Sequence, residues 1–182
     1  MPRKWLEELL EFFPKYVLDA GDYEVVHADT IPSPYRRILD HEHHMTVTLE
    51  EHCGCLVHLK VVDVHRKADD YARQLTLTAG PDGPNVLAGI MRFNLSQVSD
   101  EIREEIVAAK TPLGRLLIEH GVLRRLQPSV FLKIKTTSPF GELLGLDDNE
   151  TERWPETYGR LALIFCNDQP AVELLEVVTP TL

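Results

Sequence analysis

Arg73 stands in an apolar row of a segment with a strand-like pattern. Side chains alternate over residues 70–79, and the face that carries Arg73 also carries Tyr71, Leu75 and Leu77. A buried guanidinium without a partner is costly, so Arg73 needs a carboxylate from the protein or from a ligand. Its planar set of donors suits a carboxylate better than a lysine would. The pattern therefore indicates a carboxylate-binding site, with a structural ion pair or an edge strand as the alternatives.

Glu176 is a second charged residue in an apolar row. In the segment 171–178 it shares a face with Leu174 and Val178, whereas Glu173 falls on the opposite face if the strand has no bulge. A carboxylate in such a row requires either solvent at a sheet edge or a polar partner. Glu176 is therefore a candidate functional carboxylate, and a solvated edge strand is the alternative.

The segment A-K-T-P-L-G-R-L-L at 109–117 contains a helix start. Thr111 is a good N-cap residue, and Pro112 suits the first helical position. The free N–H groups of a first helical turn, with their positive dipole character, are a suitable place for an anion. Most capped helix starts bind nothing, so this feature depends on the residues that surround it.

Histidines and cysteines gather in the stretch 41–55, as H-E-H-H and then H-C-G-C. These side chains are suitable metal ligands, but their spacing matches no common zinc signature and no second cysteine pair occurs. Phosphate-cradling glycine loops and the G-x-S-x-G motif are also missing from the sequence. We therefore expect no metal and no cofactor, and the role of the stretch 41–55 stays open.

Composition limits the class of protein. A chain of 182 residues with 43% hydrophobic and 26% charged residues is typical of one globular domain, over 1–182. Its formal net charge of −10 disfavours binding to nucleic acid or to an anionic membrane. Three cysteines, no apolar run of 18 residues, and glutamates within the apolar part of the N-terminus predict a cytoplasmic protein without a signal peptide.

Hydrophobic periodicity predicts the order of elements. Helices are expected at 4–13, 99–109 (with Ser96 as an alternative start) and 112–121. Strands are expected at 23–28, 55–65, 70–79, 85–95, 129–136, 158–166 and 171–178. Residues 45–53 fit both a helix and a strand, and the polar residues 141–156 are typical of an exposed connection. This order predicts an α+β fold with a single antiparallel β-sheet, helices packed on one face and a helical insertion between strands.

Five motifs, taken in order, resemble the chorismate pyruvate-lyase family, the 4-hydroxybenzoate synthases of ubiquinone biosynthesis. They are H-M-T-V-T-L-E-E at 44–51, Y-A-R-Q-L-T-L at 71–77, L-A-G at 87–89, K-T-P-L-G-R at 110–115 and the final E-V-V-T-P at 176–180. The resemblance begins near residue 38, so residues 1–37 are expected to form an N-terminal helical extension outside it. It implies a chorismate lyase-like fold, a helix at 45–53, and a lyase that eliminates pyruvate from chorismate without a cofactor.

The resemblance also implies roles for individual residues. Arg73 would bind the ring carboxylate of chorismate, and Glu176 would contact the hydroxyl at ring position 4. Backbone groups of Met45 and Leu113 would complete the polar contacts, and Gly89 would allow close approach of the ring. A second carboxylate of chorismate would require a second cation, to be found among the arginines Arg92, Arg115 and Arg160.

Two departures from the family pattern affect this assignment. The family has an arginine directly after the Ala-Gly pair, where this chain has Ile90, and Arg92 could substitute from the same strand face. One extra residue between Pro170 and Glu176 makes Glu173 a rival for the carboxylate role.

A protein of another class fits the same residues. The chain could bind an aromatic acid without turning it over, as the sensor domains of this fold do when attached to bacterial DNA-binding domains. No helix-turn-helix fits residues 1–37, which argues against a regulator. The expected partner is in both cases a small molecule, and the protein is expected to be a monomer or a small homo-oligomer. The sequence fixes neither the hydroxybenzoate isomer nor the pathway.

Overall fold

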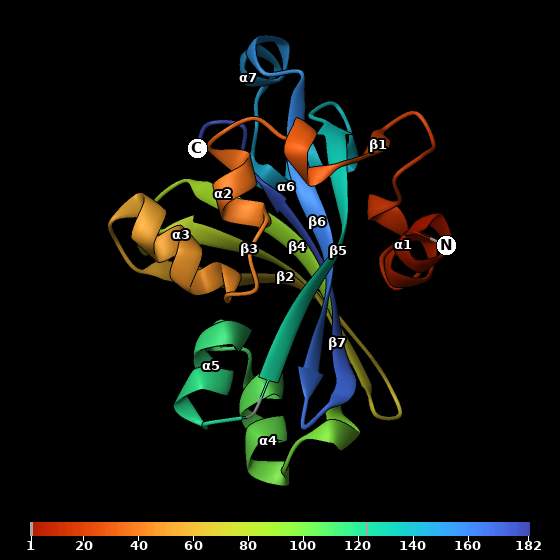
Figure 1. Ribbon diagram of the computed structural model, residues 1–182, viewed down its shortest axis with the longest axis vertical. Helices are drawn as coiled ribbons and strands as arrows, with labels where there is room; N and C mark the ends of the chain where they lie inside the picture. Colours follow the sequence, from red (N-terminus) through yellow and green to blue (C-terminus); the bar gives the residue numbers. More distant parts are fainter. Residues whose placement is uncertain (1, 123) are drawn as a thin grey trace.

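A computed structural model describes residues 2–122 and 124–182 (Figure 1). Seven antiparallel strands of the described chain form one sheet in the order β1-β5-β6-β7-β4-β3-β2. The strands are β1 Tyr23–Val26, β2 Val57–Lys67, β3 Asp70–Ala79, β4 Asn85–Asn94, β5 Arg124–Lys135, β6 Glu156–Cys166 and β7 Gln169–Val178. The C-terminal hairpin β6–β7 therefore lies in the middle of the sheet, beside β4.

Local chemistry explains the turns that set this register. The hairpin β6–β7 closes through a two-residue loop, Asn167 and Asp168, both with positive φ. This is the backbone that two-residue hairpin turns favour, and Asn and Asp tolerate it well. The resulting pairing places Glu176 opposite Gly89 on one side and opposite Arg160 on the other. Three residues from three strands are thus aligned across the middle of the sheet.

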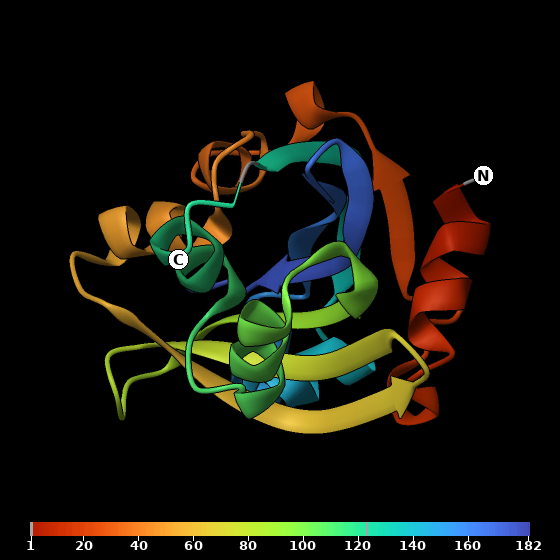
Figure 2. The same ribbon diagram turned by 90° about the horizontal axis from the view of Figure 1, so that it is seen from below.

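Helices cover both faces of the sheet. On one face lie α2 Tyr35–Leu39, α3 Met45–Cys53, α4 Asp100–Ala108 and α5 Leu113–Glu119. The opposite face is covered by α1 Pro2–Leu10 and α6 Pro139–Leu144, with a single 3₁₀ turn, η1 Pro14–Tyr16, beside them. Figure 2 shows the curved sheet from below, with α3 and α5 on one side of it and α1 on the other. Each face is therefore shielded by its own hydrophobic core.

The predicted fold class is confirmed, as an α+β fold with one antiparallel sheet and the helical insertion α4–α5 between β4 and β5. Residues 45–53 are helical, and Gly54 ends that helix with φ +67. Helices α1 and α6 cover the second face of the sheet, whereas the sequence predicted helices on one face only. This second helical layer forms because Leu6, Leu9 and Leu10 of α1 are fully buried on the sheet.

Two local predictions were wrong. Residues 141–156 are not simply an exposed connection, because they contain the buried end of α6 and the helix α7 Asp148–Arg153. The acidic stretch is a capping box, in which Asp147 and Glu150 bond to each other's backbone N–H. Thr111 does not cap the next helix, because α5 begins after Pro112 and has no side-chain cap.

Candidate functional site

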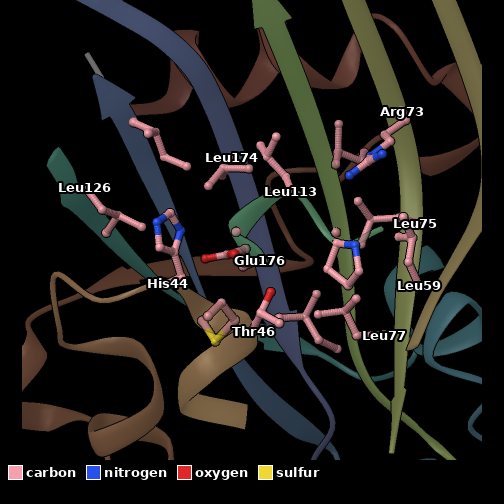
Figure 3. Close-up of a pocket in the computed structure, with 17 residues that line it drawn as sticks. His44, Thr46, Leu59, Arg73, Leu75, Leu77, Leu113, Leu126, Leu174 and Glu176 are labelled. Atoms are coloured by element: carbon pink, nitrogen blue, oxygen red, sulfur yellow. The ribbon is translucent and has the colours of Figure 1, made fainter. Parts of the chain in front are cut away.

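A pocket lies between the sheet and the N-terminal ends of α3 and α5 (Figure 3). Its volume is about 60 Å³, or about 530 Å³ when the space at its open mouth is counted. The polar groups in its wall come mainly from Arg73, Glu176, His44 and Thr46. The remaining wall is mostly leucine, from Leu59, Leu75, Leu77, Leu87, Leu113, Leu126 and Leu174. An apolar cavity with a few polar groups is the usual form of a small-molecule site.

Arg73 projects from β3 into this pocket and has no ion-pair partner among the described residues. It is only 1% exposed, and its Nε and Nη1 atoms are buried without a hydrogen-bond partner. Burial lowers the pKa of Arg73, and the neighbouring Tyr71 partly opposes this effect. The Tyr71 hydroxyl is itself buried without a hydrogen bond. The pocket thus contains a desolvated cation with two unused nitrogen donors, Nε and Nη1.

Glu176 lies across the pocket from Arg73 and is held by a different arginine. Nε of Arg160 donates to Oε2 of Glu176 over 2.7 Å, between strands β6 and β7. Nη1 of Arg160 donates to the carbonyl oxygens of Leu39 (2.8 Å) and His41 (3.0 Å). Its third nitrogen, Nη2, is buried without a partner. Arg160 therefore joins the pocket carboxylate to the segment between α2 and α3.

Backbone groups at two helix starts complete the polar wall. The N-cap residues are His44 for α3 and Pro112 for α5, and neither cap makes a side-chain hydrogen bond to the helix. The first-turn N–H groups, including those of Met45 and Leu113, consequently have no capping side chain. In Figure 3 the carboxylate of Glu176 extends toward the side of the pocket where His44 lies.

Small residues and one ion pair keep the two helices close to each other and to the sheet. A Cβ atom on Gly114 would lie 3.0 Å from Cβ of His44, so only glycine fits this contact without displacement. Arg115 pairs with Glu50, and the same carboxylate accepts a hydrogen bond from the N–H of Val57 at 3.1 Å. The start of α5 is therefore fastened to α3 and to strand β2.

Five of the six predicted site residues line this one pocket. They come from three strands and two helices, and are Arg73, Glu176, Met45, Gly89 and Leu113. A Cβ atom on Gly89 would lie 3.0 Å from the carbonyl oxygen of Leu175 and would crowd the pocket floor. The structure therefore brings together residues that are up to 131 positions apart in the chain.

Arg92 is the exception and requires a correction. It lies on the opposite face of β4, where it pairs with Asp70 at 3.1 Å and with Glu173 at 3.5 Å. The alternation of β4 causes this difference, since the pocket face of that strand carries residues 87 and 89. Glu173 accordingly lies away from the pocket, and Glu176 is the carboxylate that lines it.

The sequence did not reveal the role of Arg160. It appeared only as one of three arginines for a second ligand carboxylate, whereas Arg115 pairs with Glu50 and Arg160 pairs with Glu176. An arginine directly before the apolar run L-A-L-I-F was the available signal. The partner of Arg160 depends on the β6–β7 register, which shifts between Ile164 and Phe165.

The histidines and cysteines of 41–55 do not gather into a cluster of three or more metal-ligating atoms within the described chain. His41 instead accepts a hydrogen bond at Nδ1 from the N–H of His43, and Cys53 and Cys55 are free thiols. Glu101, Glu105 and His120 do bring three such atoms within 4.8 Å of one another, on α4 and after α5.

Solved structures resemble this fold. No family model and no curated protein matches the sequence. PhnF from Mycobacterium smegmatis aligns with 98% of this chain and 79% of its own at 14% identity, with a TM-score of 0.55. The effector domain of the same protein, solved alone, aligns with 76% of this chain and 90% of its own at 13% identity, with a TM-score of 0.53.

The chain has the chorismate lyase-like fold. This is the fold of the effector domains of GntR-family regulators, and at 13–14% identity the likeness extends to the fold alone. No helix of the described chain is long and apolar enough to span a membrane.

Replacing Arg73 with methionine is expected to stabilise the ligand-free protein. Methionine removes an unpartnered buried charge but retains similar volume, so the free energy of unfolding should rise by about 1–2 kcal/mol. Arg160→Met is the matched control. It should lower that free energy by about 3–5 kcal/mol, because Glu176 and two carbonyl oxygens lose their donor. Urea unfolding measures both changes, and equal destabilisation by the two variants would mean that Arg73 has a structural partner.

Acid is expected to destabilise the fold through His41. Burial, together with the nearby Arg160, lowers the pKa of His41 from 6.5 to about 4. Between these values the unfolded chain binds a proton that the folded chain does not, so stability falls as the pH falls from 6.5 to 4. His41→Gln should reduce this loss in urea-unfolding midpoints measured across the range. The exposed His27 offers the control, and His27→Gln should follow the unmodified protein.

Proposed function

We propose that this chain is a binding domain for a small planar organic acid. The observation that carries the proposal is Arg73, a buried guanidinium that projects into an apolar pocket with Nε and Nη1 unpaired. A cation in such a position costs free energy unless an anion meets it. A ligand carboxylate would accept a charge-assisted hydrogen bond from such a donor.

The opposite end of the pocket selects a different group. Glu176 offers a carboxylate, and the unpaired Nη2 of Arg160 lies on the guanidinium that holds it. A ligand hydroxyl can donate a hydrogen bond to this carboxylate. Leucine side chains occupy the space between the two ends, which favours a ring over a flexible polar chain. The proposed ligand class is therefore a hydroxylated aromatic acid, with 4-hydroxybenzoate as its simplest test compound.

The charge of the pocket also supports binding of an acid, whereas its volume requires movement on ligand entry. Arg73 and Arg160 together outweigh Glu176, so the pocket is locally positive within a chain of net charge −10. The cavity volume of about 60 Å³ is smaller than that of typical ligand sites, about 300–1,000 Å³. Entry of a ring would thus require α3 and α5 to separate from the sheet. Movement of helices on ligand entry is what a ligand-responsive domain needs.

The likeness to the effector domain of PhnF favours binding over turnover. The environment of Glu176 also favours binding over turnover, because its Oε2 already accepts a hydrogen bond from Nε of Arg160 at 2.7 Å. A carboxylate held in an ion pair can orient a hydroxyl without exchanging a proton.

Chorismate elimination is the second candidate. It is favoured by the presence of Arg73, Glu176, Met45, Gly89 and Leu113 in a single pocket, as the resemblance to chorismate pyruvate-lyases implies. The ring of chorismate is one step from aromatic, so the protein would need only to position it and to shelter it from water. The products would be pyruvate and a hydroxybenzoate.

Binding is expected to depend on the ligand carboxylate and on Arg73. Calorimetric titration should show saturable binding of 4-hydroxybenzoate, and none at similar concentration of 4-hydroxybenzyl alcohol, which lacks the carboxylate. Arg73→Met should weaken binding by about 2–5 kcal/mol, roughly 30-fold or more. Arg73→Lys should restore only part of that loss. Equal binding of the acid and the alcohol would refute the assignment of Arg73.

Glu176→Gln separates a binding protein from a lyase. Glutamine can still hydrogen-bond a hydroxyl, so affinity for 4-hydroxybenzoate should change by less than about tenfold. If the chain turns over chorismate, measured as pyruvate release, the same substitution should lower kcat by about 100-fold or more. Glu173→Gln on the opposite face is the control and should affect neither quantity. Binding of 4-hydroxybenzoate without pyruvate release from chorismate would exclude the lyase.

A further inference from the structure

A second cavity lies on the other face of the sheet, beneath the segment that follows α1. Its volume is about 380 Å³, or about 690 Å³ with its open mouth, which is within the range of small-molecule sites. The wall consists of Phe13, Pro14, Lys15 and Tyr16 from the segment after α1, Val62, Asp63 and His65 from β2, and Gln74 from β3. It is called the Gln74 cavity below.

Gln74 forms the floor of this cavity and is fully buried, with 0% of its surface exposed. Neither its carbonyl oxygen nor its NH₂ group has a hydrogen-bond partner among the described residues. A buried amide with both groups unpaired is costly, and native proteins rarely contain one without a reason. An acceptor and a donor thus lie side by side at the bottom of a cavity.

The backbone around Gln74 leaves room for a ligand. Strand β2 contains a bulge between Val61 and Asp63, next to the position where it pairs with Gln74. A bulge bends its strand and interrupts the ladder locally. In the cavity wall the ring of Phe13 packs against the ring of His65 in an edge-to-face arrangement, with centroids 5.1 Å apart. Aromatic side chains therefore form part of the wall above the amide.

The charged groups around the cavity already have neighbouring partners. Lys15 pairs with Glu142 at 3.6 Å and also lies over the ring of Tyr16, 5.3 Å from its centroid. Asp63 lies 3.6 Å from Nε2 of His65. A neutral ligand therefore fits the cavity better than an ion does.

We propose that the Gln74 cavity binds a neutral planar compound with a lactam or primary carboxamide edge. Such an edge presents one N–H donor beside one carbonyl acceptor, which matches the acceptor and donor of the Gln74 amide in two parallel hydrogen bonds. Phe13 and Tyr16 supply apolar area for the ring of the ligand. This site is separate from the Arg73 pocket, because Gln74 and Arg73 point to opposite faces of β3.

NMR titration of the full chain with 2-pyridone tests this proposal. The side-chain NH₂ signal of Gln74, assigned by its loss in Gln74→Leu, should shift and saturate as the lactam is added. N-methyl-2-pyridone has the same ring but no N–H donor, so it should bind at least about tenfold more weakly. No saturable shift at about 10 mM 2-pyridone, or equal affinity for the two compounds, would overturn the proposal.

Variants place the binding in this cavity. Gln74→Leu should reduce the affinity for 2-pyridone by about tenfold or more, whereas Gln97→Leu, outside the cavity, should leave it unchanged. Arg73→Met should also leave it unchanged, which separates this site from the proposed acid pocket. His65→Ala provides a second variant if Gln74→Leu does not fold, and it should weaken binding by opening the wall. Unchanged affinity in every folded cavity variant would contradict the assignment.

Discussion

The buried guanidinium of Arg160 connects more of this molecule than any other described side chain of the site. It joins β6 to β7 through Glu176, and it joins the sheet to the α2–α3 segment through the carbonyl oxygens of Leu39 and His41. The position of α3 over the sheet, and hence of His44 and Met45 in the pocket, depends on these bonds. The lowered pKa of His41 is a further effect of the same charge, together with burial. The Arg160–Glu176 ion pair therefore contributes both to the fold and to the chemistry of the pocket wall.

Arg73, unlike Arg160, does not stabilise the fold of the ligand-free protein. A side chain with unpaired buried donors weakens the fold, and a stable protein would not require it. Active and binding sites commonly retain groups of this kind, because the missing interaction is made by the ligand. Arg73 in the pocket wall and Arg160 behind Glu176 thus have different tasks, although both are almost completely buried. Arg160 makes three hydrogen bonds within the protein, whereas Nε and Nη1 of Arg73 have no partner.

The sequence predicted the strands and their faces well, because alternation in β3 and β7 is an intrinsic property of each strand. Arg73 and Glu176 were identified in this way, since a charge in an apolar row requires a partner. The failures involve features that depend on pairing between distant segments. Arg92 was assigned to the pocket because its strand was known but its face relative to the pocket was not. The Arg160–Glu176 pair required the β6–β7 register, which includes an irregularity that no local pattern shows.

The predictions of helices were incomplete for a related reason. The polar stretch around Asp147 and Glu150 looked like a loop because capping residues and loop residues have the same composition. The docking of α1 likewise depends on a sheet face that forms only after distant strands have paired. Composition and periodicity indicate which face of a helix is apolar, but not which surface will cover it.

The alternation of β3 places two consecutive residues, Arg73 and Gln74, in two different cavities on opposite sides of a single layer of backbone. Insertion or deletion of one residue before this pair would exchange the guanidinium and the amide between the two faces and bury each in the wrong surroundings. Substitutions can change either side chain separately, whereas a change in length alters both together. Strand β3 should therefore tolerate length variation far less than the turns at its ends, and related chains should differ in length at those turns.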